Sequence, residues 1–245
     1  MARALALLDA LAASETGLGV NELARRIGVN ASTASRLLAT LQDAGMVERA
    51  EGGPYRLGLK LVALSDRVLA RLDVRERARP LLAALVAQTG ETATLSIPGG
   101  GEAITVDFVP SPSSVVSLAR VGRPSVPHAT AVGKVMLAYA PPGQGRRGAL
   151  TAFTERSIVD PDALEVELSG VRERGYAEAI GEREPDLAAL AAPVFGRGGG
   201  LAAILGVQGP ASRLPAATRR TLRGPLTAAA AELSRALGAD GQPRG

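Results

Sequence analysis

The fold of the N-terminal part of this chain is decided by residues 21–41, which read Asn21-Glu-Leu-Ala-Arg-Arg-Ile-Gly28-Val-Asn30-Ala-Ser-Thr-Ala-Ser-Arg-Leu-Leu-Ala-Thr-Leu41. The pattern predicts two helices joined by a tight turn at Gly28. We expect Asn21 and Asn30 to be the N-caps, because an Asn side chain accepts a hydrogen bond from the free backbone N–H groups of a helix start. The stretch therefore predicts a helix-turn-helix, whose second helix enters the major groove of DNA.

The second of these helices has an apolar and a polar face. Apolar residues recur every three or four positions and form one face of the helix, at Ala34, Leu37, Leu38 and Leu41. The residues expected to contact DNA carry short polar groups or a guanidinium group, and they are Asn30, Ser32, Thr33, Ser35, Arg36 and Thr40. Arg36 is suited to a bidentate contact with guanine. The alternative is an ordinary helix pair with a solvated polar face.

Residues 46–58 predict a wing after the helices. Two short alternating runs flank Gly52-Gly53, which is typical of a hairpin. Arg49 and Arg56 are expected to contact backbone phosphate, which positions the domain without reading sequence. The alternative is that both arginines are simply solvated at a strand edge. Ahead of the helix pair, a stripe of leucines predicts a first helix, namely Leu5, Leu8 and Leu11.

Composition excludes several classes of function. No run of 18 apolar residues exists, so we expect no membrane span, and the absence of cysteine excludes disulfides and fits a cytoplasmic protein. Asp9 interrupts the apolar run after Arg3, which argues against an export signal. The net charge of the 245 residues is only +4, which argues against a non-specific electrostatic binder, so specific contacts are expected to carry more of the DNA affinity.

A boundary is expected at residues 59–75. This segment is too apolar and too periodic for a flexible linker, and it predicts a connecting helix that needs a partner. The simplest partner is a second copy of the chain, because a dimer of helix-turn-helix domains reads two DNA half-sites. The predicted organisation is a winged helix-turn-helix at 1–58, a linker helix at 59–75 and a further domain at 76–245.

The second half mixes predicted hairpins and helices, which indicates an α+β domain with an antiparallel sheet. Its predicted strands are Thr92–Ile97, Ala103–Val109, Val115–Ala119, Leu190–Phe195 and Leu201–Gln208. Its predicted helices begin at Arg77, Ala131, Asp162 and Pro215, and we expect the last one to be broken near Gly224-Pro225.

Several motifs, in order, make the chain resemble the IclR family of transcriptional regulators over nearly its whole length. They include residues 30–41, Tyr55-Arg-Leu-Gly58, Thr89-Gly-Glu-Thr92, residues 122–138 and Ala191-Ala-Pro-Val-Phe195. The resemblance implies a winged helix-turn-helix joined by a linker helix to a GAF-like effector-binding domain. It also implies a homodimer or a dimer of dimers that binds a double-stranded DNA operator and a small-molecule effector.

An effector site is expected where a helix begins near Ala131. The stretch from His128 to Lys134 opens that helix, and its free N–H groups favour an anion such as a carboxylate. Thr130 offers a hydroxyl group, while Ala131 and Gly133 leave room for close approach. The resemblance adds further pocket residues, namely Glu182, Pro193, Gly206 and Gln208. The alternative is that Gly133 serves helix–sheet packing and that Lys134 pairs with a structural carboxylate.

The chain also departs from the family pattern. It starts almost inside the first helix, where relatives carry an N-terminal arm, so arm-mediated contacts are in doubt. Gly181-Glu182 keeps one carboxylate of a usual acidic pair. Gly206 and Gln208 stand where some members have serines, so the effector is expected to differ from theirs.

Catalysis is not expected. One histidine and no cysteine leave no zinc site or Cys–His pair, and Gly133-Lys134 fails the P-loop pattern. No cofactor is expected either. The predicted function is a transcriptional regulator whose operator affinity responds to a small organic acid or related metabolite. The alternative is a non-catalytic sensor or assembly module that uses its helix-turn-helix for protein contacts.

Overall fold

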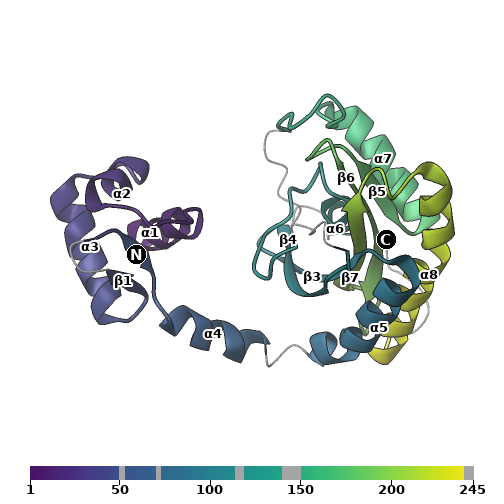
Figure 1. The fold of residues 1–245 in the computed structure, drawn as a ribbon, viewed down its shortest axis with the longest axis horizontal. Helices are drawn as coiled ribbons and strands as arrows, with labels where there is room; N and C mark the ends of the chain where they lie inside the picture. The colour runs from purple at the N-terminus through teal and green to yellow at the C-terminus, as the bar shows by residue number, and fades with distance from the viewer. Residues whose placement is uncertain (50–52, 70–72, 114–118, 140–149, 240–245) are drawn as a thin grey trace. The chain divides into compact units, whose positions relative to one another are not determined.

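The computed structural model describes residues 1–245 except 50–52, 70–72, 114–118, 140–149 and 240–245. The chain divides into two units, Met1–Arg71 and Leu72–Gly245, shown in Figure 1. Each unit has its own sheet and its own packed helices, and each is described by itself.

The N-terminal unit is a winged helix-turn-helix, as predicted. Its elements are α1 (Ala2–Ala12), α2 (Val20–Arg26), α3 (Ala31–Asp43), β1 (Val47–Arg49), β2 (Tyr55–Leu57) and α4 (Lys60–Leu69). Gly28, between α2 and α3, has a φ of 68°, a conformation that glycine adopts without strain. β1 and β2 pair in an antiparallel hairpin, and Leu18 bridges to Tyr55 on its other edge. Buried side chains from α1, α2, α3 and the hairpin form one core, namely Leu7, Leu11, Leu23, Leu38, Val47 and Tyr55.

Two expectations for the first helices were wrong. The buried pair on α1 is Leu7 and Leu11, at i and i+4, whereas Leu5 points outward and is 55% exposed. α2 begins at Val20, so its N-cap is Gly19 rather than Asn21. Starting two residues earlier lets Val20 pack against the core of the unit.

The C-terminal unit is an α+β domain with a five-stranded antiparallel sheet. Its elements are α5 (Asp73–Thr89), β3 (Thr92–Gly99), β4 (Glu102–Val109), α6 (Ala131–Tyr139), α7 (Pro161–Arg174), β5 (Ala177–Ile180), β6 (Leu187–Phe195), β7 (Leu201–Pro210) and α8 (Ala216–Ala236). The strand order is β4-β3-β7-β6-β5, and every neighbouring pair is antiparallel. α5 and α8 pack together against the sheet, and α6 packs against its strands with α7 as its neighbour (Figure 1).

Alternation along the strands separates two cores. Leu95, Leu190 and Leu205 are fully buried, whereas Ile204, next to Leu205 on β7, belongs to the core that contains α6 and α7. On β3, residues Thr94 and Ser96 flank Leu95 and therefore share the opposite face from it. Beside α6, this face of β3 therefore carries hydroxyl side chains, which can line a polar binding site.

Two helices, α5 and α8, differ from the prediction. α5 begins at Asp73 rather than Arg77, with Asp73 bonded to Arg77 at i, i+4, and it continues through Pro80. α8 is likewise continuous through Pro225. Both helices bury apolar side chains before and after the proline, and this packing outweighs the roughly 3 kcal/mol that an interior proline costs.

Strand β5 is not expected from the sequence, because the alternation of this four-residue edge strand is too short to stand out. The predicted strand Val115–Ala119 lies almost wholly outside the described residues.

Candidate DNA-binding and effector sites

Helix α3 presents the polar face that its sequence predicts. Ala34 and Leu38 are buried, whereas Ser32, Ser35, Arg36 and Thr40 are exposed, and Thr33 is half-buried. The Asn30 side chain accepts a 2.8 Å hydrogen bond from the backbone N–H of Thr33, which confirms its capping role. The Thr40 hydroxyl donates to the carbonyl of Arg36 over 3.1 Å. Asn30 and Thr40 thus support the helix, while the serines and Arg36 lie on its open face.

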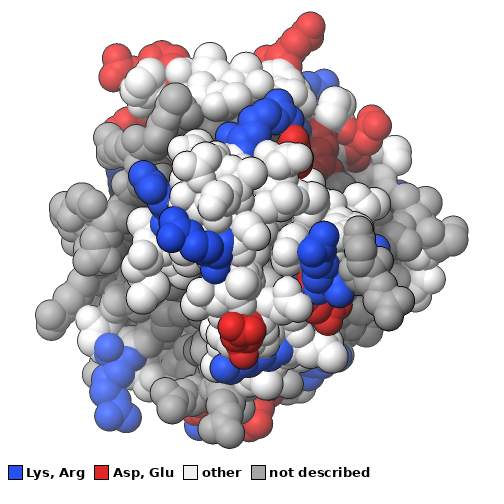
Figure 2. Space-filling model, turned by 90° about the vertical axis from the view of Figure 1, so that its left-hand side faces the viewer, with Lys and Arg blue, Asp and Glu red and all other residues white. Residues whose placement is uncertain are grey.

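The two wing arginines are exposed but anchored. Arg49 Nε donates to the carbonyl of Gly53 over 3.2 Å, and its guanidinium lies 5.1 Å from the centre of the Tyr55 ring. Arg56 Nε donates to the carbonyl of Thr16 over 3.4 Å. Each guanidinium keeps further N–H donors for phosphate beyond the one used here. On the face shown in Figure 2, Lys and Arg side chains surround an area of uncharged residues, and acidic ones lie mostly toward the edge.

The C-terminal unit contains a cavity of about 80 Å3 where α6 begins. Its walls come from β3, β4, the segment before α6, the β5–β6 connection and the neighbouring positions of β6 and β7. The polar side chains that line it are Thr94, Ser96, Thr105, Arg120, Arg123, Ser125, Thr130, Glu182, Arg183, Glu184 and Gln208. No aromatic residue of the described chain lines this cavity.

Four of the predicted effector residues line this cavity together: Thr130, Ala131, Glu182 and Gln208. Gly206 borders it, because a Cβ atom there would lie 2.6 Å from Thr94 Oγ1 and 3.4 Å from Val132 Cγ2. His128, Gly133 and Pro193 do not line it. Part of the predicted set is therefore assembled, from α6, the β5–β6 connection and β7.

The remaining three residues have other surroundings. His128 is buried, and its Nε2–H donates to the carbonyl of Thr151 over 2.9 Å. Gly133 allows a close approach, because a Cβ atom there would lie 2.5 Å from the carbonyl oxygen of Pro127. Pro193 lines a separate open groove with Tyr139 and Phe195. The close approach at Gly133 is to the segment just before α6, rather than to a strand or to the cavity.

Thr130 serves the start of α6. Its hydroxyl donates to the carbonyl of Val126 over 2.8 Å and accepts from the backbone N–H of Gly133 at 3.1 Å. The backbone N–H groups of Ala131 and Val132, both lining the cavity, precede the first N–H that has an acceptor within the helix. The positive end of the helix dipole therefore borders the cavity.

Lys134 forms a buried ion pair with Glu182. Its side chain is 2% exposed, and Nζ lies 2.7 Å from Glu182 Oε1 and 3.6 Å from Glu167 Oε1. Nζ also donates to the carbonyl of Glu178 over 3.0 Å. The other carboxylate oxygen of Glu182 is buried without a hydrogen-bond partner. Burial outweighs the attraction of Lys134 and raises the pKa of Glu182.

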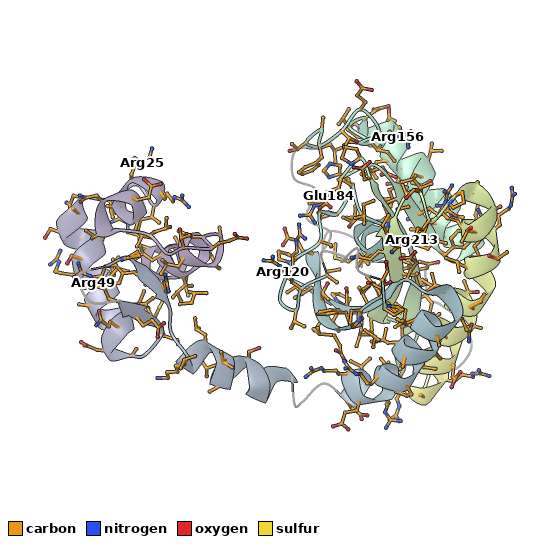
Figure 3. The ribbon with its side chains drawn as sticks, in the orientation of Figure 1. Arg25, Arg49, Arg120, Arg156, Glu184 and Arg213 are labelled. Carbon is orange, nitrogen blue, oxygen red and sulfur yellow. The ribbon has the colours of Figure 1, made fainter. Side chains whose placement is uncertain are left out.

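The sequence reasoning missed three arginines and the polar strand residues of this cavity. Arg120 and Arg123 come from the segment before α6, and Arg183 and Glu184 from the β5–β6 connection. Figure 3 labels Arg120 and Glu184, which lie on the same side of the C-terminal unit. The alternation Thr92-Ala-Thr94-Leu-Ser96 was an available signal, because it gives a predicted strand one polar face.

The described residues hold no group of three or more His, Asp or Glu side chains arranged for a metal ion. Among the helices of the described chain, none has the length and apolar composition that a membrane span requires.

Comparison with known proteins agrees with both units. Residues 1–51 match the family model of the IclR helix-turn-helix domain, and residues 66–235 match that of the bacterial transcriptional regulator IclR C-terminal domain. The chain is 34% identical over 243 residues to the HTH-type transcriptional regulator XynR of Escherichia coli strain K12, covering 96% of each chain.

Solved structures show the same similarity. An IclR transcriptional regulator from Silicibacter sp. TM1040 is 31% identical with a TM-score of 0.86, covering 99% of this chain and 97% of that one. An IclR homologue from Microbacterium hydrocarbonoxydans, complexed with 4-hydroxybenzoate, is 26% identical with a TM-score of 0.77, covering 96% and 98%.

Proposed function

This chain belongs to the IclR family and is a DNA-binding transcriptional regulator rather than an enzyme, and we propose that a small organic anion in the cavity beside α6 sets its operator affinity. The observation that carries the proposal is the cavity itself. It combines the N-terminus of α6 with several guanidinium groups, both of which favour negative charge.

The relatives support the class of ligand. The Microbacterium homologue is complexed with 4-hydroxybenzoate, a carboxylic acid. In the present chain the cavity is small and lined by hydroxyl groups without aromatic side chains, which favours a short polar acid over a flat aromatic one.

The proposed mechanism is a population shift between placements of two DNA-reading units. The N-terminal units read the operator with the open face of α3, through Ser32, Ser35 and Arg36, and with the wing arginines. An effector that binds one placement more tightly changes operator affinity by that difference in binding free energy. The linker helix α4 connects each reading unit to the domain that holds the effector.

We infer that the protein acts as a homodimer or a dimer of dimers in the cytoplasm. On and beside α4, Leu59 is 78% exposed, Val62 56% and Leu64 42%. An amphipathic helix with uncovered apolar residues is stabilised by a second copy of the chain. Two reading units then contact two half-sites, which multiplies specificity.

Fluorescence anisotropy tests the proposal. The full-length protein is titrated onto duplex DNA from its own upstream intergenic region and onto a scrambled duplex, over a salt series. Selective binding followed by a shift in affinity on adding an organic acid is expected. If operator binding is selective but no acid in a metabolite panel changes it, then effector control through the cavity is wrong.

The alternative, a module that uses its helix-turn-helix for protein contacts, predicts equal and weak binding to both duplexes. The family matches favour the regulator, since they cover both the helix-turn-helix and the C-terminal domain.

A further inference from the structure

Five of the described residues line the cavity beside α6 with a side-chain hydroxyl group, and four of these hydroxyls have hydrogen-bond partners in the protein. Ser96 and Thr105 bond to each other at 3.4 Å. Ser125 accepts from a backbone N–H, and Thr130 bonds within the segment that starts α6. The fifth is Thr94 of β3, which is only 4% exposed and whose hydroxyl makes no hydrogen bond to the described part of the chain. Its hydrogen-bonding capacity is therefore available to a ligand.

Gly206 on the neighbouring strand leaves space for the Thr94 hydroxyl. The two residues are direct partners in the register of β3 and β7. A Cβ atom on residue 206 would lie 2.6 Å from Thr94 Oγ1, closer than such atoms approach, and 3.4 Å from Val132 Cγ2 in the first turn of α6. The Thr94 hydroxyl thus lies over the backbone of β7, on the side of the cavity where α6 begins.

The start of α6 supplies two further hydrogen-bond donors to this part of the cavity. The backbone N–H groups of Ala131 and Val132 have no acceptor within the helix, and the helix dipole favours an anion there. A carboxylate has about four lone-pair sites, more than these two N–H groups use, and a hydroxyl rotates to suit its acceptor. Thr94 is therefore suited to be a third donor to an anion at the start of α6.

We propose that Thr94 is a ligand-binding residue, whose hydroxyl donates to the carboxylate of a small acid held at the start of α6, and that residue 206 is a glycine because a side chain there would displace this hydroxyl. The inference deepens the proposed function and rests on it for its regulatory meaning. The hydroxyl makes no hydrogen bond that stabilises the described fold, whereas a hydrogen bond to a charged group stabilises a bound ligand. Thr94 thus contributes to binding rather than to folding.

Thr94→Val tests this assignment, because it removes the hydroxyl and keeps the branched shape of the side chain. The full-length protein is titrated by calorimetry with acetate, propionate and lactate, and with propionamide as a neutral analogue, in a buffer free of other carboxylates and of phosphate. The wild type is expected to bind at least one carboxylate more tightly than propionamide. Thr94→Val is expected to weaken that binding about tenfold, because a hydrogen bond to a charged group is lost.

Stability measurements separate this role from a structural one. Urea unfolding of ligand-free Thr94→Val is expected to show stability equal to or above that of the wild type, since no hydrogen bond within the described fold is lost. Thr221→Val, at an exposed position of α8, is the matched control for both measurements. Unchanged carboxylate affinity in Thr94→Val, or no binding of any of the three carboxylates to the wild type at millimolar concentration, overturns the proposal.

Moving the hydroxyl from β3 to β7 tests the geometry. Gly206→Ala is expected to weaken carboxylate binding, because its Cβ atom would displace the Thr94 hydroxyl. In Thr94→Ala/Gly206→Ser the crowded oxygen is absent, and the new serine places a hydroxyl in the same space. This double variant is expected to bind the carboxylate more tightly than Thr94→Ala does. Equal binding by the two, with both folded by circular dichroism, contradicts the proposed position of the hydroxyl.

Operator anisotropy with the same carboxylates separates this inference from the proposed function. A carboxylate that binds through Thr94 without changing operator affinity contradicts effector control and supports this inference. A carboxylate that changes the operator affinity of the wild type and of Thr94→Val at the same concentrations contradicts this inference and supports the proposed function.

Discussion

Lys134 and Glu182, 48 residues apart in the sequence, form a 2.7 Å ion pair that joins helix α6 to the connection after β5. The pair lies beside the cavity at the start of α6, since Glu182 also lines that cavity. The lysine is almost wholly buried, and its remaining hydrogen bond goes to the carbonyl of Glu178. The start of α6 is therefore fixed to the β5–β6 connection by a charge pair rather than by apolar packing alone.

The first prediction concerns this pair. Lys134→Met is expected to lower the free energy of unfolding of the C-terminal unit by about 3–5 kcal/mol, because the carboxylate of Glu182 is left buried without a cation. The double variant Lys134→Met/Glu182→Gln is expected to recover part of the loss. Urea unfolding followed by circular dichroism measures both.

The chain supplies a matched control in its one other lysine. Lys60 is exposed on α4, so Lys60→Met is expected to leave stability unchanged. Equal effects of the two lysine substitutions would show that the ion pair contributes nothing to stability.

The second prediction is a pH dependence from Glu182. Its pKa is raised in the folded protein, so the native state binds a proton more tightly than the unfolded chain. The stability from this group is therefore present at pH below the ordinary pKa of a glutamic acid, and it is lost as pH rises through the raised value. The free energy of unfolding of the wild type, relative to Glu182→Gln, is expected to fall across that interval. Urea titrations at a series of pH values measure it, and a difference that stays flat or rises with pH contradicts the assignment.

The third prediction concerns Gly133. A Cβ atom there would lie 2.5 Å from the carbonyl oxygen of Pro127 and 2.6 Å from that of Val126. Gly133→Ala is expected to cost about 1–3 kcal/mol of stability by overpacking. Thermal unfolding compares it with Gly170→Ala in α7, where the Cβ atom meets only the movable end of the Arg174 side chain. If Gly133→Ala is as stable as Gly170→Ala, then close packing does not explain this glycine.

The fourth prediction concerns DNA reading. Arg36→Ala is expected to cost about 1–3 kcal/mol of operator binding, since Arg36 is exposed on the polar face of α3 and suited to a bidentate base contact. The fold is expected to stay intact, because the buried face of α3 is unchanged. Operator anisotropy measures the effect, with Arg220→Ala in the C-terminal unit as a control of equal charge change. If the Arg36→Ala variant binds the operator as tightly as the wild type, then Arg36 is not part of the recognition surface.

The fifth prediction concerns assembly through the linker helix. Val62→Glu is expected to shift the protein toward the monomer, because a charge would enter an apolar contact between two copies of α4. Val166→Glu is the control, since Val166 is 75% exposed on α7. Size-exclusion chromatography with light scattering reports the mass. A Val62→Glu variant with the wild-type mass excludes this face as the interface.

Much of the local structure was predictable from the sequence because its causes are local. Asn30 caps α3 through its own Oδ1 atom, and Gly28 takes a backbone conformation available to glycine. The wing and the strand pairs β3–β4 and β6–β7 follow from alternating runs around glycine turns. The predicted break in α8 was wrong for a reason that is not local: the helix continues through Pro225 because tertiary burial on both sides outweighs the missing hydrogen bond.

The candidate site was predictable only in part. Thr130 and Ala131 could be placed because a helix start is visible in sequence, and Glu182 and Gln208 through the family resemblance. Arg183 was not, because nothing around it in the chain marks it as different from other surface arginines.

The sequence by itself thus determined the winged helix-turn-helix, the α+β class of the second unit and the family, since helix caps, turns and hydrophobic periods act over a few residues. Only the tertiary structure decided which side chains share the cavity. The sheet order β4-β3-β7-β6-β5 places residues of β3 beside those of β7, more than 100 residues later. The pairing of Lys134 with Glu182 and the meeting of Arg123 with Arg183 depend on such long-range contacts, because electrostatic partners are set by distance in space rather than along the chain.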